Sequence, residues 1–150
     1  MLRRIRPGGA SPGLPHDGQG PRKAVDGGHA PARLLQGREF HESARSLITL
    51  AQSESYNPAV TLMVTAAIAY SDAITAKARG IVNQHDHQGA PRLLREVLGN
   101  RLPDKQEKFF RKLLGRKDEV NYGARSTTLE EAQRLLAELD DFAAWAEGHV

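Results

Sequence analysis

The chain has 150 residues, enough for one domain, and a net charge of +3. Residues 1–37 hold six basic and two acidic residues, a net of +4, whereas residues 38–150 hold fifteen and sixteen, a net of −1. The excess positive charge therefore lies in the first quarter, which argues against a strongly cationic nucleic-acid-binding domain. The absence of cysteine excludes a disulfide scaffold, a thiolate zinc site and a cysteine nucleophile. No apolar run approaches the ~18–20 residues that cross a bilayer, so we expect a cytoplasmic protein without a membrane segment.

The first segment, residues 1–37, has the composition of a disordered extension. It contains 8 of the 14 glycines and 5 of the 8 prolines, and its large apolar residues are few and scattered. Such a stretch buries too little surface to offset the entropy of ordering it. Three interpretations compete: a basic tail that touches RNA or a partner, a cleaved targeting segment, and a dispensable extension, which we favour.

Helical spacing begins at Arg38. Apolar residues at 40, 44, 47 and 51 share one helix face, and this helix should end within residues 53–56. Asn57 and Pro58 look like an N-cap followed by proline at the first helical position. Residues 59–78 are alanine-rich and apolar around most of the circumference, which predicts the central helix, with Gly80 as its stop.

Residues 81–90 are polar and predict a loop. Short helices are expected over 92–98 and 104–114, while 115–125 is ambiguous and could be a last helical turn followed by a bend at Gly123. Two overlapping capping boxes, Thr127 with Glu130 and Thr128 with Glu131, predict the start of a final helix that runs to about Glu147. No segment alternates with period two, so we expect no sheet. Residues 38–150 therefore predict an all-α, four- or five-helix up-down bundle.

The predicted core is built largely from alanine, and each alanine buries little apolar area. At roughly 25 cal/mol per Å², such a core is marginal for a domain of this size. Dimerisation through a helix face would compensate, so we expect a homodimer.

Metal and cofactor motifs are weak or absent. The His85-Asp86-His87 trio lies in a predicted loop, and two imidazoles two residues apart rarely hold one ion without a third ligand. Neither a Walker sequence nor a Gly-x-Gly-x-x-Gly after a strand occurs. We expect no metal and no cofactor, and regard His87 as a hydrogen-bonding residue.

Asp72 stands in the middle of the apolar central helix. An ionised carboxylate in a core costs several kcal/mol unless it is paired. We expect an ion pair with an arginine or lysine of a neighbouring helix; the alternative is a carboxylate of a functional site. The basic run from Lys105 to Lys117 reads more simply as a solvated face than as a phosphate-binding surface.

The strongest concentration of polar groups is residues 116–125, RKDEVNYGAR, between two predicted helices. Arginine and lysine here suit a phosphate, and Asp118 or Tyr122 could orient them. The alternative is a polar turn between helices.

The order of these segments resembles the HEPN superfamily of small helical domains. The resemblance rests on SYNPAV, AAIAYSDAI, HDHQGA and LLGRKDEVNYGAR, followed by an EEA-type last helix, and it covers residues 38–150. It is similar in particular to a bacterial branch with a Lys-x-x-x-x-Tyr-Gly turn, here from Lys117 to Tyr122 and Gly123. It implies a helical bundle that dimerises, and either a metal-independent ribonuclease or a binding partner of RNA, nucleotide or a minimal nucleotidyltransferase.

The family's catalytic pattern, an arginine, four to six intervening residues and then a histidine, is incomplete here. Arg116 matches the arginine and Lys117 the polar residue after it, but Asn121 and Tyr122 occupy the histidine positions. Asparagine does not titrate, and tyrosine, with a reference pKa near 10, is a poor base. We therefore expect a nucleotide-, RNA- or partner-binding module that uses Asp72, His87, Lys117, Asn121 and Arg125. The alternatives are a ribonuclease of a toxin–antitoxin or phage-defence system using Arg116, Asp118 and Tyr122, and the partner of a nucleotidyltransferase.

Overall fold

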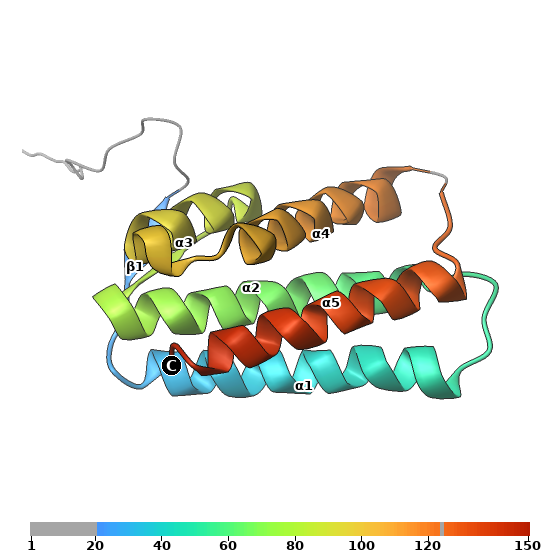
Figure 1. Ribbon diagram of the computed structural model, residues 1–150, viewed down its shortest axis with the longest axis horizontal. Helices are drawn as coiled ribbons and strands as arrows, with labels where there is room; N and C mark the ends of the chain where they lie inside the picture. The colour runs from blue at the N-terminus through green and yellow to red at the C-terminus, as the bar shows by residue number, and fades with distance from the viewer. Residues whose placement is uncertain (1–20, 124) are drawn as a thin grey trace, which may run out of the picture.

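Five α-helices and a two-stranded sheet form the parts of the chain described by the computed structural model, residues 21–123 and 125–150 (Figure 1). The expected all-α bundle is confirmed. The elements are, in chain order, β1 (Arg22–Ala24), α1 (His29–Leu50), α2 (Asn57–Arg79), β2 (Ile81–Asn83), α3 (Ala90–Leu98), α4 (Asp104–Tyr122) and α5 (Leu129–Glu147). One-turn 3-10 helices at His87–Gly89 and Gly99–Arg101 precede and follow α3.

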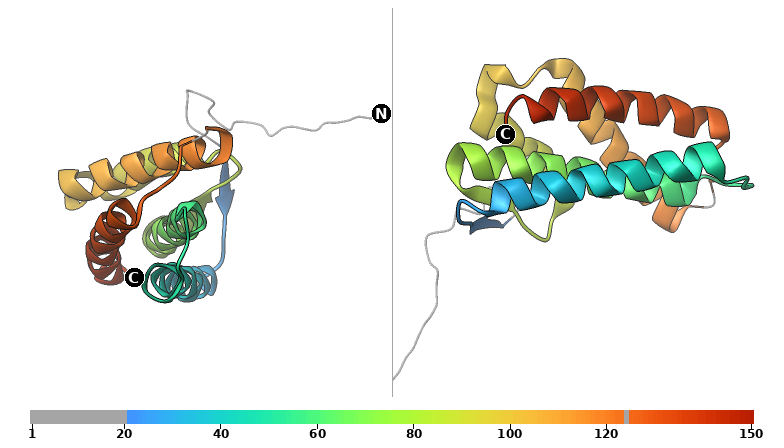
Figure 2. Two further views of the ribbon diagram at one scale, coloured as in Figure 1. Left: turned by 90° about the vertical axis from the view of Figure 1, so that its right-hand side faces the viewer. Right: turned by 90° about the horizontal axis from the view of Figure 1, so that it is seen from below.

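Helix α2 is the centre of the bundle, as its composition predicts. Seen along the helix axes, α1, α4 and α5 lie around it (Figure 2). Its length and apolar composition would suffice to cross a membrane, but most of it is buried inside the bundle, as in the core helix of a soluble protein. The chain leaves α2 at Gly80, which adopts the predicted left-handed conformation (φ 66°) and donates its N–H to the Ala76 carbonyl.

Alanine lines the close contact between α1 and α2, whereas aromatic side chains fill the space between α4 and α5. The ring of Phe142 lies 5.8 Å from that of Phe109, 5.5 Å from that of Phe110 and 5.5 Å from that of Trp145. The core therefore contains many small residues on α2 and a group of rings between α4 and α5.

The prediction of disorder up to residue 37 is wrong for residues 21–37, whereas residues 1–20 lie outside the described residues. Helix α1 begins at His29, not near Arg38. The buried positions Ala30, Gly37, His41, Ala44 and Ile48 follow three- and four-residue steps, so one face of the helix continues back through the glycine-containing segment. Small side chains at this face let α1 and α2 approach closely. The prediction of disorder considered only large apolar residues and so overlooked this contact.

The sheet is a second correction, because none was expected. Strand β1 pairs antiparallel with β2, with Lys23 opposite Val82. Three-residue strands are too short for period-two alternation to show in the sequence. The pair anchors the chain ahead of α1 beside the end of α2, and Arg22 binds both carboxylate oxygens of Glu96 on α3 (2.8 and 2.9 Å).

The ambiguous segment after residue 114 is helical. Helix α4 continues through Gly115 to Tyr122, and the chain then reaches α5 through a short connection. Of the two expected capping boxes, the structure contains the one formed by Thr128 and Glu131. Thr127 is instead fully buried and is bonded to other elements.

Candidate functional site

The RKDEVNYGAR segment is the end of a helix rather than a free turn, and its two arginines are neutralised. Arg116 is buried; it donates to Glu119 Oε1 (2.7 Å) and to Thr127 Oγ1 (2.6 Å). The Thr127 hydroxyl in turn donates a hydrogen bond to Asn57 Oδ1 (2.6 Å). Arg116 thus links the end of α4 to the starts of α5 and α2.

Arg125 is held at the same place. Its guanidinium pairs with Glu119 and with Glu131, and its carbonyl accepts from Asn57 Nδ2 at 3.1 Å. The sequence suggested that Asn57 caps α2, but its side chain makes no such bond. It joins α2 to the connection between α4 and α5 instead. The two arginines that sequence reasoning assigned to phosphate binding are paired with protein groups here.

Three other predicted residues of this segment face solvent. Asp118, Asn121 and Tyr122 are exposed, and the Tyr122 side chain keeps 87 % of its accessible surface. Asn121 follows Lys117 by one helical turn and shares its side of α4. An exposed ring at the end of a helix is available to stack on a base or to contact a partner.

Asp72 lies away from Arg125, at the end of this segment. Asn57 begins α2 beside Arg125, and Asp72 is fifteen residues further along, about 22 Å at 1.5 Å per residue. The prediction of an ion pair is confirmed: Asp72 Oδ2 accepts from Arg33 of α1, 2.9 Å from Nη2 and 3.1 Å from Nε. Burial raises the pKa of Asp72 to about 6, although the charge and hydrogen bond of Arg33 act in the opposite direction.

His87 and Lys117 form a second pair. Lys117 Nζ lies 3.3 Å from His87 Nδ1, and an ammonium can only donate, so the imidazole accepts. The pKa of His87 is lowered by burial, then by the positive charge of Lys117 and, more weakly, by that of Arg33, while Asp86 raises it. Arg33 of the first pair therefore lies within electrostatic range of His87 in the second.

Arg33, Asp72, His87 and Lys117 together are called the polar cluster below. Four elements contribute to it: α1, α2, the 3-10 turn that contains His87, and α4. The Asp86 carboxylate accepts from Gln88 N (3.1 Å), which fixes the start of that turn. Three of the four residues were predicted as ligand-binding, whereas Arg33 was missed because it belongs to the segment assigned to disorder.

A second group of buried polar side chains was also missed. His41 of α1 lies between Tyr70 of α2 (Nδ1 to hydroxyl oxygen, 2.9 Å) and Asp140 of α5 (Nε2 to Oδ1, 2.7 Å). With Asp140 ionised, Nε2 carries the proton and the Tyr70 hydroxyl donates to Nδ1. Burial raises the pKa of Tyr70 to about 12. The signal in the sequence was the position of His41, one turn after Gly37 on the buried face of α1.

His41 and Tyr70 border an open hollow of about 300 Å³ that Arg38 and Arg45 also line. Arg38 binds Glu147 through two contacts (2.7 and 2.5 Å), and Arg45 binds Asp140. Both ring nitrogens of His41 bond to protein groups, one to the Tyr70 hydroxyl and one to the Asp140 carboxylate. The hydrogen bonds of His41 connect α1 to α2 and α5.

The expected basic face of α4 is also largely paired. Lys105 binds Asp141 (2.8 Å) and Lys112 binds Glu138 (2.6 Å), both on α5. Lysine pairs of this kind fit a solvated helix face. Within residues 21–123 and 125–150, no group of three or more histidine, aspartate or glutamate side chains is arranged to hold a metal ion.

Comparison with models of known protein families and with curated proteins finds no match for this chain.

Proposed function

We propose that this domain is a non-catalytic binding module for a phosphate-bearing ligand, a nucleotide or a segment of RNA, held at the polar cluster. Lys117 carries the proposal. Its only hydrogen-bond partner among the described residues is the neutral imidazole of His87, whereas Lys105, Lys112 and Arg125 each pair with a carboxylate. Lys117 therefore has a charge left for an incoming anion.

The other members of the polar cluster complete the chemistry. Arg33 and Lys117 bring two positive charges to this part of the surface; the Asp72 carboxylate pairs with Arg33, and the Asp86 carboxylate acts on His87. Arginine and lysine supply charge-assisted hydrogen bonds to phosphate oxygens, and the neutral His87 ring can add a donor from Nε2. The Asp72 carboxylate is an acceptor for a sugar hydroxyl or a base amino group. The helical bundle, read together with the HEPN-like motifs, supports this assignment.

The test is binding of adenosine 5′-monophosphate and of a short fluorescent single-stranded RNA to the whole chain at about 50 mM and about 200 mM salt. Lys117→Gln should weaken RNA binding about fivefold at low salt and reduce the slope of log K against log salt by about one. Lys108→Gln, an exposed change on the same helix, is the matched control and should have little effect. Equal loss in both variants would contradict binding at the polar cluster.

The ribonuclease alternative is tested with the same RNA in EDTA. Arg116, its main cation, is buried and bonded to Glu119 and Thr127, so the described contacts favour binding over cleavage through Arg116, Asp118 and Tyr122. Intact RNA after long incubation is the expected result. Cleavage by the wild type that is lost in Arg116→Lys, with the fold retained, would support the nuclease instead.

The homodimer and the nucleotidyltransferase partner stay predictions. Light scattering at tens of micromolar tests the homodimer, and a native pull-down tests the partner. Leu35 of α1, with 55 % of its surface exposed, is an apolar residue that such a contact could cover.

A further inference from the structure

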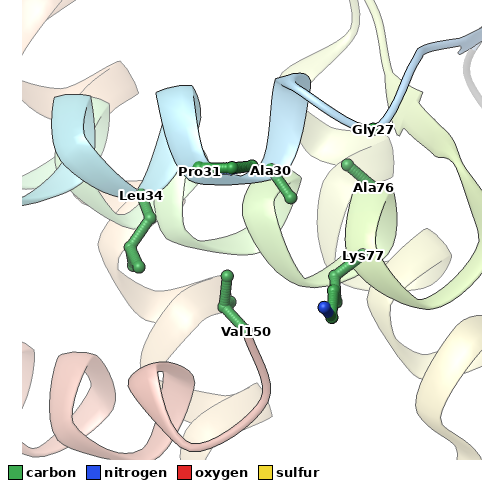
Figure 3. Close-up of a pocket in the computed structure, with 7 residues that line it drawn as sticks. All are labelled: Gly27, Ala30, Pro31, Leu34, Ala76, Lys77 and Val150. Atoms are coloured by element: carbon green, nitrogen blue, oxygen red, sulfur yellow. The ribbon is translucent and has the colours of Figure 1, made fainter.

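The two ends of the helical bundle differ in charge. Where α1 begins and α2 finishes, the last turn of α2 carries Lys77 and Arg79, and Figure 3 shows Lys77 there. At the opposite end, α1 and α4 finish and α2 and α5 begin (Figure 1, right-hand side; Figure 2, left). The Tyr56 N–H donates to the Thr127 carbonyl (3.0 Å) and so joins the two connections of that end. This second end is called the acidic end below and comprises residues 47–59, 116–123 and 125–131.

The acidic end has more negative than positive charge. Its residues include five acidic and three basic side chains. Arg116 and Arg125 pair with carboxylates of the same end. The third cation, Lys117, donates to His87. Three exposed carboxylates at this end have no ion-pair partner among the described residues: Glu54, Asp118 and Glu130. The acidic end is therefore complementary to a positively charged partner.

Apolar side chains are exposed at the same end. Of the four large apolar side chains that are exposed among the described residues, three belong to the acidic end and the fourth is Leu35. The three stand where α1 and α4 finish and where α5 begins: Leu50 (81 % exposed), Tyr122 (87 %) and Leu129 (40 %). Single exposed apolar residues are normal on a protein surface, whereas a group of them marks a contact site.

A groove of about 200 Å³ adds a socket to this end. The turn of α1 before Leu50, the chain after it and the start of α2 form its apolar lining, which is Leu47, Ala51, Tyr56, Pro58 and Ala59. The volume is below the ~300–1,000 Å³ of pockets that hold small-molecule ligands, and it suits a single side chain. Side chains anchored in such pockets supply much of the binding energy of protein–protein contacts.

We propose that the acidic end binds a basic segment of a partner protein that carries an apolar anchor residue. The anchor enters the groove and packs against Leu50, and neighbouring lysine or arginine side chains pair with Glu54, Asp118 and Glu130. A nucleic acid does not fit this end, because its phosphates would meet an excess of carboxylates. The contact does not involve the polar cluster, so either proposal can fail alone.

The first experiment measures the binding of fluorescent peptides to the whole chain by anisotropy. The three peptides have equal length and are built from leucine and lysine, from leucine and glutamate, or from serine and lysine. The leucine–lysine peptide should bind, and more weakly as salt is added, because salt screens exposed charges. Absence of its binding, or equal binding of either other peptide, would overturn the proposal.

A pair of leucine variants locates the apolar contact. Leu50→Ser should weaken the binding of the leucine–lysine peptide about three- to tenfold, since part of the side chain is no longer buried against the peptide. Leu35→Ser changes an exposed leucine of the same helix outside the acidic end and should leave binding unchanged. Equal effects of the two changes would place the peptide elsewhere.

A pair of carboxylate variants tests the charge. Glu54→Gln should weaken the same peptide by up to about fivefold, the range of an exposed ion pair. Glu39→Gln, an exposed change on α1 outside the acidic end, is the matched control and should have no effect. Both changes are at the surface, so the variants should fold. If the two variants bind alike, the charge assignment is wrong.

A second copy of this chain is the rival occupant of the acidic end. Light scattering without peptide, on the wild type and on Leu50→Ser, tests it. Equal masses together with peptide binding by the wild type support the proposal. A lower mass for Leu50→Ser, with no binding of the leucine–lysine peptide, would make this end a contact between copies and overturn it.

Discussion

Asp72 is an acidic residue buried in the fold. Its carboxyl group is buried on the central helix, and the ion pair with Arg33 does not fully replace the lost hydration, so its pKa rises to about 6. An acid with a raised pKa binds protons more readily in the folded than in the unfolded state. Its contribution to stability is therefore present below its unfolded pKa, near 4, and is lost as the pH rises through about 6.

This gives a pH prediction that Asp72→Asn isolates. We compare the free energies of unfolding of the wild type and of Asp72→Asn. The wild-type value minus the variant value should decrease as the pH rises from about 4 to about 7. A shift of about two pKa units corresponds to roughly 3 kcal/mol as an upper value. Denaturant unfolding at a series of pH values measures the difference, in which the titration of other groups cancels. A difference that grows with pH would mean that Arg33 overcompensates the burial.

The sequence was informative about Asp72 but not about its partner. A carboxylate in a helix that is apolar all round must find a counter-charge, so an ion pair was predictable from the chain alone. Arg33 could not be chosen from among the many arginines, because it stands in a segment rich in glycine and proline. Lys117 and His87 were selected as candidates, but their contact joins residues thirty positions apart and appears only in the fold.

At the scale of elements, the contact between α1 and α2 depends on a glycine. A Cβ at Gly37 would lie 3.0 Å from Cδ1 and 3.0 Å from Cε1 of Tyr70. The tyrosine ring has little freedom to retreat, because it is buried and its hydroxyl bonds to His41. Glycine is therefore required here by packing, in spite of its poor helix propensity.

Two glycine substitutions of the same kind should have opposite effects. Gly37→Ala should destabilise the protein by about 1–2 kcal/mol, the cost of overpacking less the gain in helix propensity. Gly115→Ala in α4 has no neighbouring atom within 4 Å of the new Cβ and should stabilise by ~0.5–1 kcal/mol. Thermal melts of both variants against the wild type provide the measurement. Stabilisation by Gly37→Ala would show that Tyr70 can move.

The helix boundaries show which local signals are enough to predict, from the sequence, where a helix begins or ends. Gly80 and the Thr128–Glu131 box end and begin helices as predicted, because each acts on backbone groups of its own turn. The end of α4 was ambiguous in the sequence, because a glycine such as Gly115 can either end a helix or lie within it. Gly115 is exposed and the helix continues through it. Arg116 looked functional in sequence; its buried bond to Thr127 instead ties three elements together.

For the whole molecule, residues 21–37 are part of the folded domain. Arg22 binds Glu96 on α3, and Arg33 neutralises Asp72 on α2. Strand β1 also covers the edge of β2. Loss of this segment would remove partners from three separate elements.

A chain that begins at Arg38 should therefore be much less stable than one that begins at Pro21. Removing one partner of a buried ion pair alone costs about 3–5 kcal/mol, which is a large part of the stability of a typical domain. We expect its melting temperature to fall by ten degrees or more, on the order of 3–4 °C per kcal/mol, or the cooperative transition to disappear. Circular dichroism melts of the two chains make the comparison. Equal melting temperatures would show that residues 21–37 contribute little to the stability of the bundle.

The sequence by itself determined the features that depend on neighbours along the chain. These are the all-α class, the central helix, the last helix with its cap and the need of Asp72 for a counter-charge. The tertiary structure decided which charges pair with one another among the described residues. It assigned Arg116 and Arg125 to internal contacts, left Lys117 beside His87, and brought Arg33 into the domain. The physical reason is that neutralisation of a charge depends on distance in space, which local propensity and spacing do not encode.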